Sequence, residues 1–297
     1  MKDKSKRGRP LLGVLQILLL CMSTMLAFIP ILFIGLFKLI PYTPWQSFCA
    51  RLVDRVVMFW SGVNNFFINR TQKTKWRIDG LDSLNKKDWY LIVANHQSWM
   101  DIVVLQKVFN RKIPVLKFFI KDQLKWVPLM GFAWWAMGCP FMKRYSKEQL
   151  LKHPHKKGKD IKRTQKAMRL FRYRPTSIIN FVEGTRFTEI KKGIQQSPYH
   201  NLLKPKAGGI SYAISAMGEK INSLIDVTIH YSSRRCSLWD FLCRRIDAIH
   251  VTIRKIQIPK EFLTDRLVND ANLQQSFREW LNKQWHDKDQ LLLSMNP

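Results

Sequence analysis

The rest of this sequence is organised around Asn95-His96-Gln97-Ser98-Trp99-Met100-Asp101. The apolar run Tyr90 to Ala94 before it predicts a buried strand, and the apolar spacing of Ile102 to Phe109 after it predicts a helix. Residues five apart point about 140° away from each other on one helix, but they can meet across a strand-to-helix turn. Asp101 can then hold one imidazole nitrogen of His96 while the other faces a cleft, which is the geometry of a general base. The alternative is a capped helix beside an ordinary hydrogen-bonded histidine.

A second polar turn follows another predicted strand, Ser177 to Val182. Its sequence is Glu183-Gly184-Thr185-Arg186-Phe187-Thr188. A glycine turn beside an arginine suits a phosphate, because a guanidinium binds phosphate through two parallel hydrogen bonds. Both turns leave the carboxyl ends of predicted strands, where open α/β sheets place their ligands. The alternative for Glu183 and Arg186 is a local ion pair at the start of a helix.

These two motifs resemble those of the glycerolipid acyltransferase family, which includes the 1-acylglycerol-3-phosphate acyltransferases. The resemblance covers roughly residues 90–231, and a block between the motifs also resembles that family: Lys121-Asp122-Gln123-Leu124, Pro128, Gly131, Gly138 and Arg144. The branch holding the lysocardiolipin and lysophosphatidylinositol acyltransferases is the more similar one, through Phe187-Thr188 and Leu202-Leu203-Lys204-Pro205-Lys206. One departure is that Asp226 to Tyr231 lacks the proline usual in the family's last block.

The resemblance implies an enzyme that moves a fatty acyl group from acyl-CoA or an acyl carrier protein to the free hydroxyl of a lysophospholipid. The default acceptor is 1-acylglycerol-3-phosphate (lysophosphatidic acid), which gives phosphatidic acid, and the alternative is acyl-chain remodelling of another lysophospholipid. His96 would be the general base and Asp101 its orienting carboxylate. The acceptor's phosphate would be bound by Arg186, in a turn shaped by Glu183, Gly184 and Thr185, with Lys121 as a further anion contact.

The resemblance implies no cofactor, since the thioester donor is a co-substrate. No metal site is predicted either, because Cys236, Cys243 and His230 match no familiar ligand spacing. The five cysteines are scattered and odd in number, so they do not predict a disulfide framework. They fit exposure to a reducing, cytosolic environment.

The predicted fold is α/β, a mixed sheet covered by helices, and the resemblance implies the glycerol-3-phosphate acyltransferase-like version of it. A closing amphipathic helix is expected over Asp265 to Trp285, and a helix entered through Ala207-Gly208-Gly209 is expected to end at Met217. Six apolar runs separated by helical patterns are the predicted strands: Trp76 to Asp79, Tyr90 to Ala94, Pro114 to Phe119, Ser177 to Val182, Ile225 to Tyr231 and Ala248 to Ile256.

A formal net charge of +29 implies an anionic partner, either a phospholipid surface or a nucleic acid. The apolar stretch Leu11 to Phe37 favours the membrane. The rival is a non-catalytic basic membrane protein that binds nucleic acid or an acidic partner. The charge alone supports that rival, because the sequence shows no recognisable base-reading module. We therefore expect a phospholipid membrane, and not nucleic acid, as the main partner.

The amino-terminal part divides into two segments. Residues 1–10 carry five Lys or Arg and one Asp, which predicts a basic N-terminus on the cytoplasmic side. Residues 11–40 are predicted to be a hydrophobic membrane segment, since the uncharged stretch would reach about 40 Å as a helix, beyond the roughly 30 Å hydrocarbon core. It either spans the bilayer or forms a hairpin or re-entrant element around Pro30, with Leu11 to Phe28 and Ile31 to Ile40 as its arms. We favour the hairpin, because it returns the chain to the cytoplasmic side.

Residues 41–70 are predicted to form an amphipathic helix at the membrane surface, and residues 71–297 the catalytic domain. Apolar and aromatic side chains recur in the helix at three- and four-residue steps, and the alternative is a helix packed on its own domain. These segments place the protein at the inner or cytoplasmic membrane, with the active site on the cytoplasmic side.

Two further stretches leave alternatives open. The basic segment Lys143 to Arg174 is expected to contact lipid phosphates, and its alternative is a solvated face without a special role. An apolar cluster is either part of the core or the lining of an acyl-chain tunnel: Trp126, Met130, Trp134, Trp135 and Met137.

Overall fold

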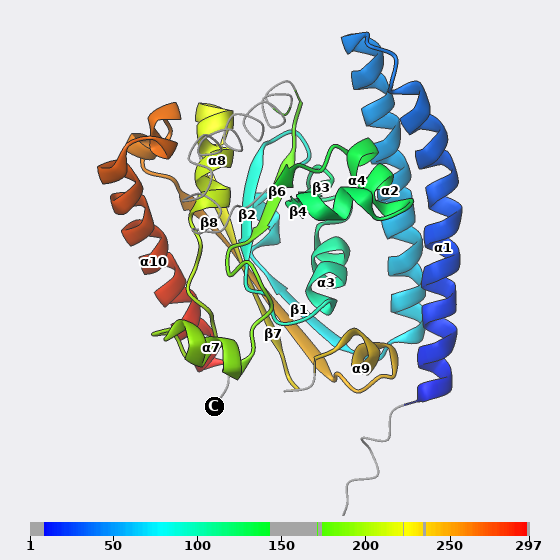
Figure 1. The fold of residues 1–297 in the computed structure, drawn as a ribbon. Helices are drawn as coiled ribbons and strands as arrows, with labels where there is room; N and C mark the ends of the chain where they lie inside the picture. Colours follow the sequence, from blue (N-terminus) through cyan, green and yellow to red (C-terminus); the bar gives the residue numbers. More distant parts are fainter. Residues whose placement is uncertain (1–8, 143–170, 172–173, 222, 234–235, 296–297) are drawn as a thin grey trace, which may run out of the picture.

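The computed structural model describes residues 9–142, 171, 174–221, 223–233 and 236–295 (Figure 1). Its centre is a six-stranded sheet in the order β1-β8-β7-β2-β6-β3. Neighbouring strands are parallel except for the antiparallel pair β7 and β8, so the expected mixed α/β sheet is confirmed. The strands are β1 (Lys75–Asp79), β2 (Tyr90–Ala94), β3 (Leu116–Phe118), β6 (Ser177–Phe181), β7 (Ser223–Tyr231) and β8 (Ala248–Gln257).

Helices cover both faces of the sheet, as Figure 1 shows. Ile92 of β2 packs in a core with α3 (Met100–Phe109), while Leu91 packs in a second core with α8 (Gly208–Met217) and α10 (Ala271–Ser294). All five residues of β2 are buried. A central parallel strand covered on both faces needs apolar side chains at every position, which explains its continuous apolar run.

Two long helices, α1 (Pro10–Phe37) and α2 (Thr43–Thr71), lie side by side along one edge of the molecule. The expected break at Pro30 is wrong, because α1 continues through it. An internal proline costs one backbone hydrogen bond. Packing of the adjacent Ile31 in a small core with Val53 of α2 and Ala136 holds the helix together across that position. The chain reverses only after α1 ends, in the short segment that precedes α2.

The second helix, α2, has two different faces. One face is buried against α1 and α3, with Cys49, Val53 and Val57 among its buried residues. On the other face, Phe59 and Phe66 are exposed. The helix therefore combines packing on its own domain with an exposed aromatic surface.

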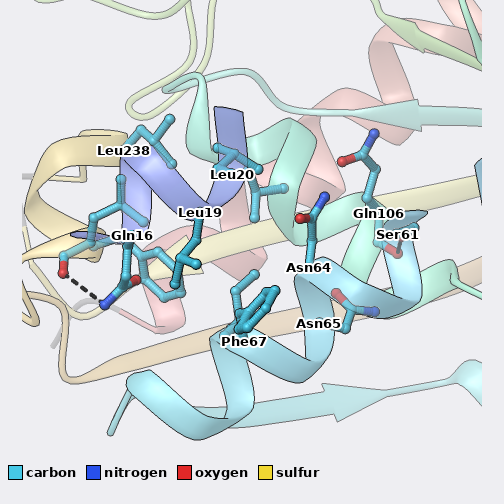
Figure 2. Close-up of a pocket in the computed structure, with 13 residues that line it drawn as sticks. Gln16, Leu19, Leu20, Ser61, Asn64, Asn65, Phe67, Gln106 and Leu238 are labelled. Atoms are coloured by element: carbon cyan, nitrogen blue, oxygen red, sulfur yellow. Dashed lines mark hydrogen bonds between the residues drawn. The ribbon is translucent and has the colours of Figure 1, made fainter. Parts of the chain in front are cut away.

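The inner face of α1 is held by polar contacts. Gln16 Nε2 donates to the Leu242 carbonyl of α9 (Leu238–Leu242) at 3.3 Å, and Ser23 Oγ donates to Asn64 Oδ1 at 2.7 Å. Figure 2 shows Gln16 and Asn64 lining a cavity of about 50 Å³ between these helices. Sites for drug-sized ligands occupy about 300–1,000 Å³, so this cavity is too small for a fatty acyl chain.

The outer face of α1 is apolar and exposed. Leu18, Leu26 and Phe33 are each about 60% exposed. Among the described residues, α1 is the one helix long and apolar enough to cross a membrane by length and composition.

The remaining elements are short. β4 (Ile120–Lys121) and β5 (Phe141–Met142) form a separate two-stranded parallel sheet beside α4 (Met130–Met137). α7 (Glu189–Gln195) follows β6. Short 3₁₀ helices cover Leu81–Ser83, Asp122–Trp126, Gly218–Lys220, Lys260–Phe262 and Asp265–Val268.

Three further expectations from the sequence concern the closing helix, the tryptophan-rich cluster and the basic segment. The closing helix α10 begins at Ala271, six residues later than expected, because Asp270 Oδ1 caps it by accepting from the Leu273 amide at 3.0 Å. The tryptophan-rich cluster divides between surface and core: Trp126, Met130 and Trp135 are exposed, whereas Met137 packs against the small core of Ile31 and Val53. Of the basic segment 143–174, only residues 171 and 174 are described, so the expectation for that segment lies outside the described residues, as does Arg144.

Candidate active site

His96 and Asp101 meet where β2 gives way to α3. His96 Nδ1 lies 2.8 Å from Asp101 Oδ2. The same oxygen accepts from the backbone amides of Gln97 at 2.7 Å and Ser98 at 2.8 Å, so the turn itself clamps the carboxylate. Asp101 is fully buried, whereas the His96 side chain is 15% exposed. A buried carboxylate therefore orients the imidazole through Nδ1, an arrangement that suits a general base acting through Nε2.

The loop that carries His96 is fixed to the neighbouring strand β7. Asn95 Nδ2 donates to the Ile229 carbonyl at 2.9 Å, and the Ile229 amide donates to Asn95 Oδ1 at 2.8 Å. These two hydrogen bonds take the place of backbone pairing between β2 and β7 just where β2 ends. They also set the direction in which the chain leaves the sheet, and so the position of His96.

A tyrosine from β7 completes the surroundings of Asp101. Tyr231 donates its hydroxyl to Asp101 Oδ1 at 2.6 Å. Burial first, and then the charge of Asp101, raises the pKa of Tyr231 well above its usual value, so the phenol stays protonated and remains a donor. No role for Tyr231 was evident from the sequence. Tyr231 lies 130 positions from Asp101, and only the pairing of β2 with β7 brings the two together.

The His96 ring rests on an aromatic support. It stacks on Phe181, the last residue of β6, with ring centroids 4.0 Å apart and an interplanar angle of 16°. Phe118 of β3 lies behind Phe181 at 6.3 Å. Packing on Phe181 therefore holds one face of the imidazole, and Asp101 holds its Nδ1.

Glu183 faces inward and binds two backbone amides. Its Oε1 accepts from the His96 amide at 2.7 Å, and its Oε2 accepts from the Leu203 amide at 2.9 Å. The residue is fully buried, and burial raises its pKa to about 8. The structure thus places Glu183 behind the histidine loop, where it supports that loop, and it turns its carboxylate away from the surface.

The second loop is tied to the first and carries Arg186 to the surface. The Phe187 amide donates to the His96 carbonyl at 2.7 Å. Gly184 allows the turn, because its φ of 71° lies in the left-handed region that favours glycine. Arg186 is exposed, and its guanidinium lies 5.2 Å from the ring centre of Trp99, which belongs to the histidine loop.

The other two proposed binding residues have different surroundings. The Thr185 hydroxyl accepts from Lys191 Nζ at 2.8 Å, and the same ammonium donates to the Arg186 carbonyl at 3.0 Å. Lys191 is a second cation at this loop that the sequence analysis missed. Lys121 is exposed in the separate two-stranded sheet, so the structure does not bring it into the hydrogen-bonded group around His96.

The chemistry available at this site is that of a general base beside a cation. In the described part of the chain, no group of three or more His, Cys, Asp or Glu side chains is placed to hold a metal ion. The His96–Asp101 pair and the arginine loop come from residues 95–101 and 183–187, at the carboxyl ends of β2 and β6.

The acyltransferase family profile matches residues 75–232, a span that contains both loops. This chain belongs to the acyltransferase family, and it is an enzyme of that class. Its relatives include a 1-acyl-sn-glycerol-3-phosphate acyltransferase epsilon of Mus musculus, 23% identical over 86% of this chain and 73% of the relative. A probable 1-acyl-sn-glycerol-3-phosphate acyltransferase 5 of Arabidopsis thaliana is 25% identical over 98% of this chain and 75% of its own length.

Two further likenesses are more limited. A 2-acyl-1-lysophosphatidylinositol acyltransferase of Saccharomyces cerevisiae is 27% identical over 40% of this chain and 32% of the relative. The crystal structure of the 1-acyl-sn-glycerophosphate (LPA) acyltransferase PlsC from Thermotoga maritima covers 93% of this chain and 97% of that chain. Its TM-score of 0.47 and identity of 15% carry no conclusion about the site.

Proposed function

We propose that this chain transfers a fatty acyl group from a thioester, acyl-CoA or acyl carrier protein, to the free hydroxyl of 1-acylglycerol-3-phosphate. The observation that carries the proposal is the buried Asp101 at 2.8 Å from His96 Nδ1, on a loop bonded directly to the loop of Arg186. The names of the mouse and Arabidopsis relatives support the same acceptor.

The proposed reaction is a direct transfer without an acyl-enzyme. His96 Nε2 removes the hydroxyl proton as the acceptor oxygen attacks the thioester carbonyl carbon. Asp101 stabilises the imidazolium that forms, and the tetrahedral intermediate then collapses by breaking the carbon–sulfur bond. The thiolate leaves readily, because a thiol pKa of roughly 8.5 is far below that of an alcohol. The proton on His96 passes to the departing sulfur, which restores the base.

Arg186 is proposed to bind the phosphate of the acceptor. It is exposed, and its loop is joined to the His96 carbonyl through the Phe187 amide. A guanidinium presents paired donors to phosphate oxygens. Lys191 stands next to it through its bonds to Thr185 and the Arg186 carbonyl, and adds positive charge at the same loop. Lys121 stays a proposed further anion contact.

Acyl transfer by membranes carrying the wild-type chain or His96→Ala tests the proposal. The assay uses an acyl-CoA or acyl carrier protein donor and a panel of lysophospholipids. We expect a loss of about 10²–10⁴-fold in His96→Ala, which is the usual contribution of a positioned general base. Full activity of His96→Ala, or no transfer by the wild type with either donor, would contradict the assignment.

A second acceptor class follows from the yeast relative, which is named for lysophosphatidylinositol. The same base and arginine would then serve acyl-chain remodelling of a phosphodiester lysophospholipid. The panel separates the two, because the remodelling function requires a lysophospholipid other than lysophosphatidic acid to give the highest kcat/KM.

Membrane attachment is proposed to occur from one side of the bilayer, with the active site on the cytoplasmic face. Both ends of α1 contact the catalytic domain: the Arg9 amide donates to the Cys243 carbonyl at 3.0 Å, and Lys38 Nζ donates to the Ala136 carbonyl at 2.9 Å. A helix of 28 residues is roughly 42 Å long, which exceeds the roughly 30 Å hydrocarbon core. If α1 crossed the bilayer, its two ends would lie on opposite sides, and the same domain could not contact both. We infer that α1 lies along the domain and presents its apolar face to one leaflet.

A further inference from the structure

Three basic side chains gather around one carboxylate at the end of α1. Lys117 of β3 pairs with Asp54 Oδ1 of α2, and Arg174 Nη1 lies 3.3 Å from Asp54 Oδ2. Lys38, which follows α1, donates to the Ala136 carbonyl near the end of α4. These residues come from four separate parts of the chain, and we call them the Asp54 cluster.

Among the described residues, the Asp54 cluster holds three basic side chains and one carboxylate, so its positive charge exceeds the negative charge beside it. The Lys117 side chain is 2% exposed, and those of Asp54 and Arg174 are 22% exposed. Burial first, and then the charges of Arg174 and Lys117, lowers the pKa of Lys38 to about 8. Arg174 Nη1 is buried and, among the described residues, has no hydrogen-bond partner despite its proximity to Asp54. An anion bound here would relieve the repulsion and provide the missing acceptor.

This cluster is separate from the His96 site. Arg174 precedes Ser177, the first residue of β6, whereas His96 stacks on Phe181, the last residue of the same strand. The four intervening steps correspond to roughly 13 Å at about 3.3 Å per residue. The two groups of charges therefore lie at opposite ends of the parallel strands.

The surroundings of the cluster resemble a membrane interface. The apolar face of α1 ends at Lys38, whose ammonium lies 5.2 Å from the ring centre of Trp135. Tyr42, four residues after Lys38 in the chain, is 62% exposed. Trp126, in the 3₁₀ helix that precedes α4, is 80% exposed. Exposed Trp and Tyr beside an apolar helix are typical of the level of lipid headgroups. At the headgroup level of a membrane, the phosphate of a phospholipid is the anion present at high density.

We propose that Lys38, Lys117 and Arg174 form a binding site for the phosphate of a membrane phospholipid, distinct from the acceptor site at Arg186. The proposal rests on the membrane attachment proposed above and does not require the acyl-transfer assignment. In this site Arg174 supplies paired guanidinium donors, and the ammonium groups of Lys38 and Lys117 add positive charge. Such a lipid would fasten the end of the α1–α2 hairpin to the catalytic domain.

Native mass spectrometry of the full chain in neutral-detergent micelles, titrated with dioctanoyl phosphatidic acid, tests the site. The wild type is expected to bind two lipids. Lys38→Gln and Arg174→Gln should each weaken one of them about fivefold. Arg186→Gln should weaken only the other. The matched control is Lys283→Gln, an exposed lysine on α10, across the sheet from α1 in Figure 1, which should change neither.

The outcomes separate the two proposals. Lipid binding unchanged in both Lys38→Gln and Arg174→Gln overturns the second site, while an unchanged Arg186→Gln removes only the acceptor assignment. Lys38→Arg keeps the charge and should bind as the wild type does, which distinguishes a lost contact from a damaged fold. A parallel titration with inorganic phosphate tests the source of the ligand. Binding of phosphate without binding of the lipid would overturn the lipid assignment.

Discussion

Two carboxylates at opposite ends of the sheet, Asp101 and Asp54, have different neighbours. Asp101 accepts from the Tyr231 hydroxyl and from two backbone amides in addition to its contact with His96. Asp54 instead faces Lys117 and Arg174. Neutral donors hold Asp101 in place without neutralising its negative charge. The negative charge of Asp54, in contrast, is already neutralised by the cations beside it.

The difference bears on what each end can do. A carboxylate held by neutral donors retains its charge for an imidazolium that forms beside it, which suits proton transfer. A carboxylate outnumbered by cations leaves a positive surplus that attracts an anion from outside. The same residue type therefore suits a catalytic base at one end of the strands and a binding site at the other.

Matched substitutions of the two carboxylates test this comparison most strongly. Asp101→Asn should lower kcat/KM about 10³-fold, roughly 4 kcal/mol, because the charge that stabilises the imidazolium is lost. Asp54→Asn should leave kcat/KM within about twofold and tighten phosphate binding at its own cluster. Acyl-transfer kinetics in the same membranes measure both. Equal losses of activity in the two variants would erase the distinction.

The pH dependence of stability tests the support behind the histidine loop. The pKa of Glu183 rises from 4.5 to about 8 on burial, so the folded protein binds this proton more tightly than the unfolded chain. Its contribution to stability is therefore complete below about pH 4.5 and is lost as the pH rises through about 8. Between about pH 6 and pH 9 the free energy of unfolding should fall about 3 kcal/mol more in the wild type than in Glu183→Gln. Thermal melting across that range measures the difference, and parallel curves would contradict the raised pKa.

Tyr231→Phe tests how much the hydrogen bond from the Tyr231 hydroxyl to Asp101 contributes to stability. Removing the hydroxyl leaves Asp101 Oδ1 buried without that donor, which should cost about 1–3 kcal/mol of stability. Tyr199→Phe is the control, because the contacts of the Tyr199 hydroxyl within the described part of the chain, both with Asn282, are long at 3.4 and 3.5 Å. Denaturant unfolding should show the larger loss for Tyr231→Phe. A larger loss for Tyr199→Phe would mean that the short bond to Asp101 adds little.

The smallest expected effect concerns the two arginines. Arg186→Lys should raise KM for a phosphate-bearing acceptor about tenfold, roughly 1.4 kcal/mol, with kcat little changed, because a lysine lacks the paired donors. Arg174→Lys should leave that KM unchanged, since Arg174 belongs to the other cluster. Initial rates over a range of lysophosphatidic acid concentrations measure both. If Arg174→Lys raised KM as much as Arg186→Lys, the two clusters would serve one acceptor.

The loops of the candidate site could be predicted because their signals are local. His96 and Asp101 are five positions apart, and the apolar patterns on either side identify a strand and a helix. The partners that complete the site could not be predicted in the same way. Glu183 is 87 positions from His96 and Tyr231 is 130 from Asp101, and no short-range pattern links such pairs. The inward direction of Glu183 depends on the Leu203 amide, which arrives from yet another segment.

The amino acid sequence by itself determined the buried strands, the turn that brings Asp101 to His96, and the apolar character of α1, because these depend on neighbours within a few residues. Only the tertiary structure decided that α1 runs through Pro30 and returns as α2 along the domain, since packing outweighed one lost backbone hydrogen bond. It also decided which carboxylate would stand among neutral donors and which among cations. The electrostatic surroundings of a carboxylate depend on its distances in space to donors and charges. For Asp54 and Asp101, the pairing of strands and the packing of helices fix those distances.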